Sequence, residues 1–148
     1  MRTNQEGQEL IKKYESLKLE AYHCSAGVCT IGWGSTSYTD GSPIKIGDKI
    51  SLETAQELFE YHLKKSEDGV SGSLMKSVSE NQFAAMVSLC YNIGSTAFRK
   101  STLAKLLNAC EDKELTAAEF YRWNQSGGRV LKGLVTRRAD EATLFLKE

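Results

Sequence analysis

The stretch that decides the fold runs from Glu15 to Gly34 and reads ESLKLEAYHCSAGVCTIGWG. Residues 5–17, which lead into it, are predicted to form a helix. Four apolar residues recur there at helical spacing: Leu10, Ile11, Tyr14 and Leu17. Within the stretch, glycines and β-branched runs such as CTIGW are typical of strands and turns. The SAGV segment between Cys24 and Cys29 has the length of a hairpin loop. A helix that leads directly into a small β-hairpin is therefore predicted.

Helical periodicity returns at Ser51 and continues towards the C-terminus. Ser51 is a predicted N-cap for a helix that reaches about residue 67. Ser79 followed by Gln82 is a capping-box pattern for an apolar helix through Tyr91. Further helices are predicted over residues 101–109, 116–123 and 134–147, with a break at Gly127 and Gly128.

These elements predict an α+β fold that is mainly helical, with the strands confined to a small antiparallel β-hairpin lobe. We expect one domain over residues 1–148, in which the small β-containing lobe spans about 16–60. The helical lobe would span about 61–148 together with the N-terminal helix. Two unequal lobes joined by a long helix would leave a substrate cleft between them.

The composition excludes several classes of protein. With 148 residues, 41% of them hydrophobic, the chain can bury a single core, and it is not expected to be disordered. The longest uninterrupted apolar run is residues 83–87, far below the roughly 20 residues of a spanning helix, so no membrane insertion is expected. The N-terminal residues lack the apolar core of a secretory signal peptide.

Charge is unevenly distributed, although the net charge is zero. Residues 1–98 carry 9 basic and 12 acidic side chains, whereas residues 99–148 carry 10 and 7. Five basic side chains and no acidic one fall within residues 120–139: Arg122, Arg129, Lys132, Arg137 and Arg138. This cluster is either a surface for an anionic polymer or a solvated basic helix face. An isoelectric point near 6.7 argues against a dedicated nucleic-acid-binding protein.

Sequence motifs for cofactors and metals are missing. There is no Walker loop, no dinucleotide-binding glycine pattern and no G-x-S-x-G elbow, so no cofactor is expected. His23 and His62 are too isolated to argue for a metal site, and His62 is interpreted as a core or boundary residue. The four cysteines match no zinc-binding spacing. Cys90 is interpreted as a small core residue and Cys110 as a helix-end residue.

Three side chains around the hairpin have the chemistry of glycosidic-bond cleavage. Glu15 lies near the end of the first helix, Cys24 precedes the loop, and Thr30 follows it in a strand. Desolvation disfavours the charged form of a carboxyl group and so lets it donate a proton near neutral pH. A second group must then activate or position water on the opposite face of the sugar. The alternative is that Glu15 is one of several solvated glutamates on an amphipathic helix.

The spacing E-x8-C-x5-T followed by IGWG resembles the catalytic signature of the phage-type lysozymes, glycoside hydrolase family 24. Residues 83–108 are similar to the family's central and following helices, and residues 120–141 to its C-terminal segment. The resemblance covers about residues 8–146. It implies a lysozyme-like fold and a phage endolysin, a muramidase that hydrolyses the β-1,4 bond between N-acetylmuramic acid and N-acetylglucosamine in peptidoglycan. Two other functions stay open, namely a lytic transglycosylase and a catalytically weak peptidoglycan-binding module.

The resemblance also implies residue roles. Glu15 would be the general acid, Thr30 would help to hold the attacking water, and Cys24 would occupy the second catalytic position, where the family has Asp or Cys. Arg137 would lie near the catalytic glutamate, with Arg138 as a second candidate. Three further residues would line the glycan groove: Thr36, Tyr91 and Ser101. Otherwise Tyr91 would cap a buried helix and Ser101 would be an N-cap.

The hairpin departs from the family pattern in two places. An ordinary thiol has a pKa of about 8.5, so Cys24 needs activation to act as a base at neutral pH. A base there predicts inversion at the sugar, whereas a nucleophile predicts retention. Ser35 stands where many relatives have histidine. If Cys24 and Cys29 lie on facing strands, a disulfide between them would cap Cys24 and lower activity.

Partners and location follow from the same resemblance. The substrate would be the glycan strands of peptidoglycan, and the enzyme would act as a monomer without nucleic acid. Because no signal peptide is recognised, the enzyme would accumulate in the host cytoplasm. A separate holin would then release it to the cell wall.

Overall fold

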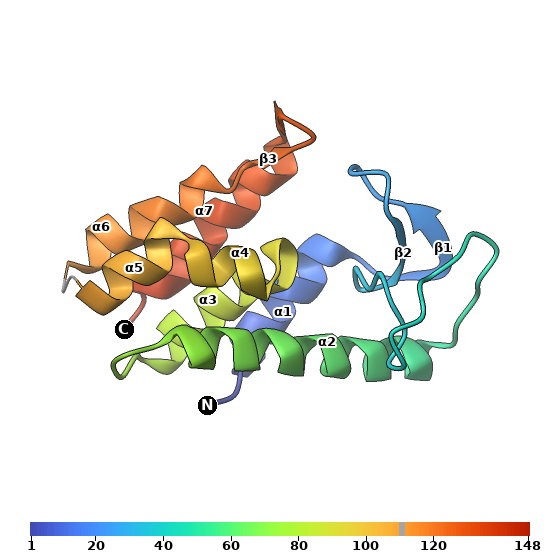
Figure 1. Cartoon of the computed structure of the whole chain (residues 1–148), viewed down its shortest axis with the longest axis horizontal. Helices are drawn as coiled ribbons and strands as arrows, with labels where there is room; N and C mark the ends of the chain where they lie inside the picture. The colour runs from blue at the N-terminus through green and yellow to red at the C-terminus, as the bar shows by residue number, and fades with distance from the viewer. Residues whose placement is uncertain (110–111) are drawn as a thin grey trace.

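The computed structural model describes residues 1–109 and 112–148 (Figure 1). Helices and two short antiparallel hairpins alternate along the chain, which confirms the predicted α+β, mainly helical fold. Cys110, which was predicted to end a helix, lies outside the described residues. The described elements are, in order, α1 (Gln5–Glu15), β1 (Lys18–His23), β2 (Cys29–Gly32), α2 (Leu52–Ser73), α3 (Glu80–Ile93), α4 (Ser95–Lys100), α5 (Thr102–Ala109), α6 (Lys113–Ala118), the 3-10 helix η1 (Glu119–Arg122), β3 (Gln125–Ser126), β4 (Arg129–Val130) and α7 (Lys132–Leu146).

The helical part of the molecule is built around α3. Residues 83–90 of this helix are at most 1% exposed, so the helix is buried on all sides. A helix of this kind is stable only when neighbours cover it, and α1, α2, α4 and α7 all pack against it. The capping box of Ser79 and Gln82 begins α3, and Gly94, with φ 91°, ends it. Both signals act locally, and for this reason the sequence located this helix well.

The β1–β2 hairpin presents two different faces. Tyr22 pairs with Thr30 and His23 pairs with Cys29 in the antiparallel register. Because side chains alternate between faces along a strand, Cys24 shares a face with Tyr22 and Thr30. Cys29 instead packs on the other side, beside a small core of three residues. That core consists of Ile31, Ile44 and Leu58.

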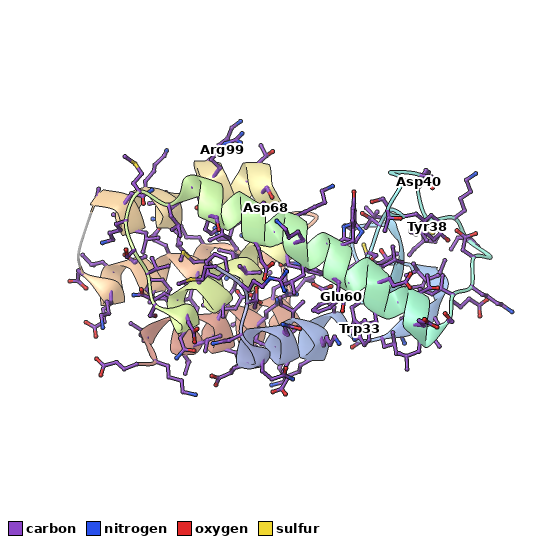
Figure 2. The ribbon with its side chains drawn as sticks, turned by 90° about the horizontal axis from the view of Figure 1, so that it is seen from below. Trp33, Tyr38, Asp40, Glu60, Asp68 and Arg99 are labelled. Carbon is purple, nitrogen blue, oxygen red and sulfur yellow. The ribbon has the colours of Figure 1, made fainter. Side chains whose placement is uncertain are left out.

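Helix α2 joins the hairpin region to the helical part, since it runs beneath both in Figure 1. Figure 2 shows it from below, with Trp33 at the junction. The Trp33 ring packs edge-on against Phe59 of α2 at 5.7 Å, and Lys12 Nζ of α1 lies 4.2 Å from the Trp33 ring centre. These contacts fix the hairpin relative to α1 and α2. Among the described residues, no helix has the length and apolar character of a membrane span.

Several element boundaries differ from the prediction. The first helix ends at Glu15 rather than at residue 17, because Ser16 adopts φ 58°. Helix α2 continues to Ser73 because it keeps a buried face there, where Glu67 accepts hydrogen bonds from the backbone and hydroxyl of Thr3. Helix α4 and the β3–β4 hairpin were not predicted, since elements of six and two residues carry too few positions for a periodic pattern.

Candidate active site

A cleft of about 660 Å³ separates the β1–β2 hairpin from the helical part of the molecule. Its walls come from the end of α1, the β1–β2 hairpin, the end of α3, the β3–β4 hairpin and the start of α7. Figure 1 shows the two hairpins facing each other at the top of the molecule. A second hollow of about 490 Å³ shares Gly34, Thr36 and residues 91–93 with this cleft and reaches α2. The two together form an elongated groove, a shape that suits a polymer.

Glu15 is the last residue of α1 and lines the cleft. Its side chain is 16% exposed, so solvent reaches it only from the cleft side. Its Oε2 accepts a hydrogen bond of 2.6 Å from Arg137 Nη1. Its Oε1 lies beside Gly34, where a Cβ atom would be only 2.9 Å from the carboxyl carbon of Glu15. The positive φ of 78° favours glycine at position 34, and a Cβ atom there would push on the Glu15 carboxyl.

Arg137 on α7 is anchored in the protein interior, with 3% of its surface exposed. Its Nε lies 3.2 Å from Glu141 Oε2, and its Nη2 donates to the Ser88 carbonyl at 3.0 Å. Burial lowers the pKa of a guanidinium, but attraction and hydrogen bonds to Glu15 and Glu141 outweigh this effect and raise the pKa of Arg137. The cleft therefore contains a fixed positive charge in contact with the candidate acid.

The hairpin face opposite Glu15 carries Tyr22, Cys24 and Thr30, all of which line the cleft. Thr30 donates its hydroxyl to the Val28 carbonyl at 2.9 Å. Burial raises the pKa of the Cys24 thiol, but hydrogen bonds, above all from the backbone N–H groups of Ala26 and Val28, outweigh that effect. The pKa of Cys24 therefore lies below its ordinary value.

Two of the three predicted groove residues line the cleft, namely Thr36 and Tyr91. Tyr91 also donates its hydroxyl to the Trp33 carbonyl at 2.6 Å, and burial raises its pKa. Ser101 is different and corrects the expectation. It is 3% exposed, it lines neither the cleft nor the second hollow, and its hydroxyl accepts from Ala104 N at 3.1 Å as the N-cap of α5.

The structure brings further residues into the cleft that the sequence did not single out. Tyr22 had a local signal, because it lies two positions before Cys24 and so shares its strand face. Burial and the nearby Glu15 and Cys24 raise the pKa of Tyr22. Tyr14 directly precedes Glu15, and the sequence assigned it only to the apolar face of the first helix. The others come from distant segments and had no such signal. They include Asn92, Trp123, Gln125, Ser126, Leu131 and Leu134.

The proposed Cys24–Cys29 disulfide is wrong for this structure. Both thiols are free, and the strand register directs them to opposite faces of the hairpin. His62 is half-buried, with Nε2 3.0 Å from the Ser37 carbonyl, as expected for a boundary residue. Within residues 1–109 and 112–148, no group of three or more His, Cys, Asp or Glu residues is arranged to hold a metal ion.

The structure divides the basic cluster of residues 120–139 between the interior and the surface. Arg137 and Arg138 are 3% and 0% exposed, so they belong to the interior rather than to a charged surface. Burial lowers the pKa of Arg138 to about 10, and Glu141 opposes that shift. Only Arg122, Arg129 and Lys132 remain on the surface beside the cleft. The expected anionic-polymer surface is therefore smaller than the sequence indicated.

The chain is similar to phage lysozymes and endolysins. The Phage lysozyme family model matches residues 12–141. The chain is 43% identical over 147 residues to an endolysin of Bacillus phage PZA, which covers 98% of this chain. Two solved structures are similar over 99% of the chain. One is the endolysin from Escherichia coli O157:H7 phage FAHEc1, with 37% identity, 94% of that chain covered and a TM-score of 0.89. The other is the muramidase domain of SpmX from Asticaccaulis excentricus, with 30% identity, 99% of that chain covered and a TM-score of 0.85.

The lengths of these proteins differ. The chain spans 55% of the Bacillus phage PZA endolysin and 54% of a second one from Bacillus phage B103, about half of each. The family match nevertheless extends over most of the chain and includes Glu15, Cys24, Thr30 and Arg137. The chain belongs to the phage lysozyme family.

Proposed function

We propose that the protein is an endolysin-type muramidase that hydrolyses the β-1,4 bond between N-acetylmuramic acid and N-acetylglucosamine in peptidoglycan. The observation that carries this proposal is the cleft in which Arg137 holds Glu15 opposite the Tyr22–Cys24–Thr30 face of the hairpin. Two chemically distinct walls are what a hydrolase needs on either side of a sugar ring. Membership of the phage lysozyme family supports the same reading.

Glu15 would protonate the leaving glycosidic oxygen. Its Oε2 is engaged by Arg137, which leaves Oε1 as the oxygen that donates the proton. The bond between the anomeric carbon and that oxygen then breaks, and a positive charge develops on the sugar ring. Arg137 fixes the orientation of the carboxyl group and stabilises its charge after the proton has left.

Cys24 and Thr30 would act on the water. The thiolate of Cys24 takes a proton from a water molecule that the Thr30 hydroxyl helps to hold, and the water oxygen bonds to the anomeric carbon. The lowered pKa of Cys24 supports a base role for the thiol. Attack by water from the face opposite Glu15 inverts the anomeric configuration. A nucleophilic Cys24 would instead give a covalent thioglycoside and retention.

The test is digestion of purified peptidoglycan in 18O-labelled water, followed by mass spectrometry of the fragments. Hydrolysis places the label at the new reducing end of N-acetylmuramic acid. A lytic transglycosylase gives an unlabelled anhydro product, and a binding module releases no fragments. Glu15→Gln should abolish release without loss of wall binding. Cys24→Ser should reduce kcat strongly, and Cys24→Asp should retain activity because a carboxylate also accepts a proton from water.

Delivery of the enzyme is a separate proposal. The endolysin relatives support a site of action at the cell wall. Two relatives carry the name SAR-endolysin, and they cover 94% and 89% of this chain. We propose that release from the host cytoplasm depends on a holin and that the enzyme acts as a monomer. Expression with and without a co-expressed holin tests the first statement, since lysis should require both proteins.

A further inference from the structure

A buried group of charges lies directly behind the candidate acid, and the proposed reaction does not use it. Glu141 of α7 is 0% exposed and lies one helical turn after Arg137. Its Oε1 is 2.9 Å from Arg138 Nε, and its Oε2 is 3.2 Å from Arg137 Nε. Ser88 of α3 donates its hydroxyl to the same Oε2. A buried carboxylate is costly unless it is paired, and a hydrophobic residue would often be at least as stable there. Stability alone therefore does not explain this residue.

The geometry of Arg137 indicates what Glu141 does. Two of the three guanidinium nitrogens are held from the interior, Nε by Glu141 and Nη2 by the Ser88 carbonyl. The third, Nη1, contacts Glu15 at 2.6 Å. A guanidinium is a planar group with fixed donor directions. Fixing the first two nitrogens therefore fixes the direction in which the third one points.

We propose that Glu141 is a positioning residue for the Glu15 carboxyl, acting through the Arg137 guanidinium. This inference rests on the proposed function, in which Glu15 is the general acid. Because Glu141 is fully buried, it does not touch the substrate. Its second effect is electrostatic, since it shares the positive charge of Arg137 with Glu15. In the described structure, Glu15 and Glu141 are the two carboxylates within hydrogen-bonding distance of Arg137. Without Glu141, the positive charge of Arg137 would act on Glu15 alone.

The test compares Glu141→Gln with the wild type on purified peptidoglycan. We expect kcat to fall about ten- to a hundredfold through misplacement of Glu15, with KM little changed. Glu6→Gln is the matched control, because Glu6 also pairs with a cation of the C-terminal segment, Lys147 at 2.8 Å, but lies on the exposed surface. The Glu6→Gln variant should change neither kcat nor KM.

The outcomes separate this inference from the proposed function. An inactive wild type would overturn the proposed function. An active wild type together with an unchanged kcat in folded Glu141→Gln would overturn only the positioning role. If Glu141→Gln does not fold, Ser88→Ala carries the test, because it removes one donor to Glu141 and leaves all charges in place. A several-fold lower kcat at constant KM supports the inference, and an unchanged kcat overturns it.

Discussion

Replacement of Gly34 by alanine tests whether the position of Glu15 controls catalysis. Gly34 has φ 78°, and the added Cβ would lie 2.9 Å from the carboxyl carbon of Glu15. Gly41 is the matched control, with φ 88° and no atom within 4 Å of an added Cβ. Both variants carry the backbone strain of a left-handed alanine, and only Gly34→Ala also pushes on the acid. The pair therefore separates backbone strain from displacement of the carboxyl.

The structure sets the expected size of each effect. A left-handed residue with a Cβ costs about 1–2 kcal/mol, and reduced freedom of the unfolded chain offsets about 0.4–1 kcal/mol. Both variants should therefore lose about 1 kcal/mol, or about 2–4 °C in Tm for a chain of this size. Carbon atoms need about 3.5–4.0 Å between them, so the Glu15 carboxyl must move by about 0.6–1 Å in Gly34→Ala. A displacement of this size costs about a hundredfold in rate.

The assay is release of fragments from purified walls, supported by lysis of outer-membrane-permeabilised Gram-negative cells. Thermal unfolding of the same preparations gives the stability change. We expect equal Tm losses in the two variants and a loss of kcat in Gly34→Ala alone. If Gly34→Ala and Gly41→Ala have the same kcat, the reasoning that links the Glu15 position to the reaction is refuted.

Three further predictions concern the stability and chemistry of individual side chains. Ser101→Ala should lower the free energy of unfolding by about 1 kcal/mol through loss of the N-cap of α5. The kcat of this variant should stay unchanged. Weaker binding of the variant to cell walls would indicate instead that Ser101 belongs to the glycan groove. Alkylation followed by peptide mass spectrometry should find Cys24 reactive at lower pH than an ordinary thiol, because its pKa is lowered. Cys90 should react slowly, because burial raises its pKa. Equal alkylation rates of Cys24 and Cys90 would contradict the lowered pKa of the first and the raised pKa of the second. The hydrogen bond from Tyr38 to Asp48 lowers the pKa of Asp48 and raises that of Tyr38 from 10.0 to about 12. The contribution of this bond should therefore disappear as pH falls through the lowered pKa of Asp48, and also as pH rises through about 12. Urea unfolding of Tyr38→Phe and wild type across pH should show stabilities that differ at neutral pH and converge at both extremes, and a constant difference would be the contrary result.

Local sequence signals located most of the long elements. Ser79 and Gln82 began α3 where their side chains cap the backbone, and Gly94 ended it. Glycines and β-branched runs indicated the hairpin, but its register, which places Cys24 on the face of Thr30, came from the structure. The helix caps and the hairpin signals depend on residues within a few positions of each other, so the sequence carries them without knowledge of the rest of the chain.

The candidate site itself depends on contacts between distant segments. Glu15 and Arg137 are 122 residues apart, and Ser88 and Glu141 are 53 apart. The residue pattern by itself left Arg137 equally consistent with a solvated helix face, and only the resemblance to phage lysozymes placed it near Glu15. Helical periodicity tells which residues share a face but not what that face meets.

The sequence by itself therefore determined the fold class, the capped helices, the hairpin and the residue types available for glycosidic cleavage. Tertiary structure alone decided that Arg137 and Glu141 form a buried pair behind Glu15 and that Arg138 pairs with Glu141 in the interior. The physical reason is that caps and strand alternation are local. Burial and charge pairing depend on which surfaces come together when the whole chain packs.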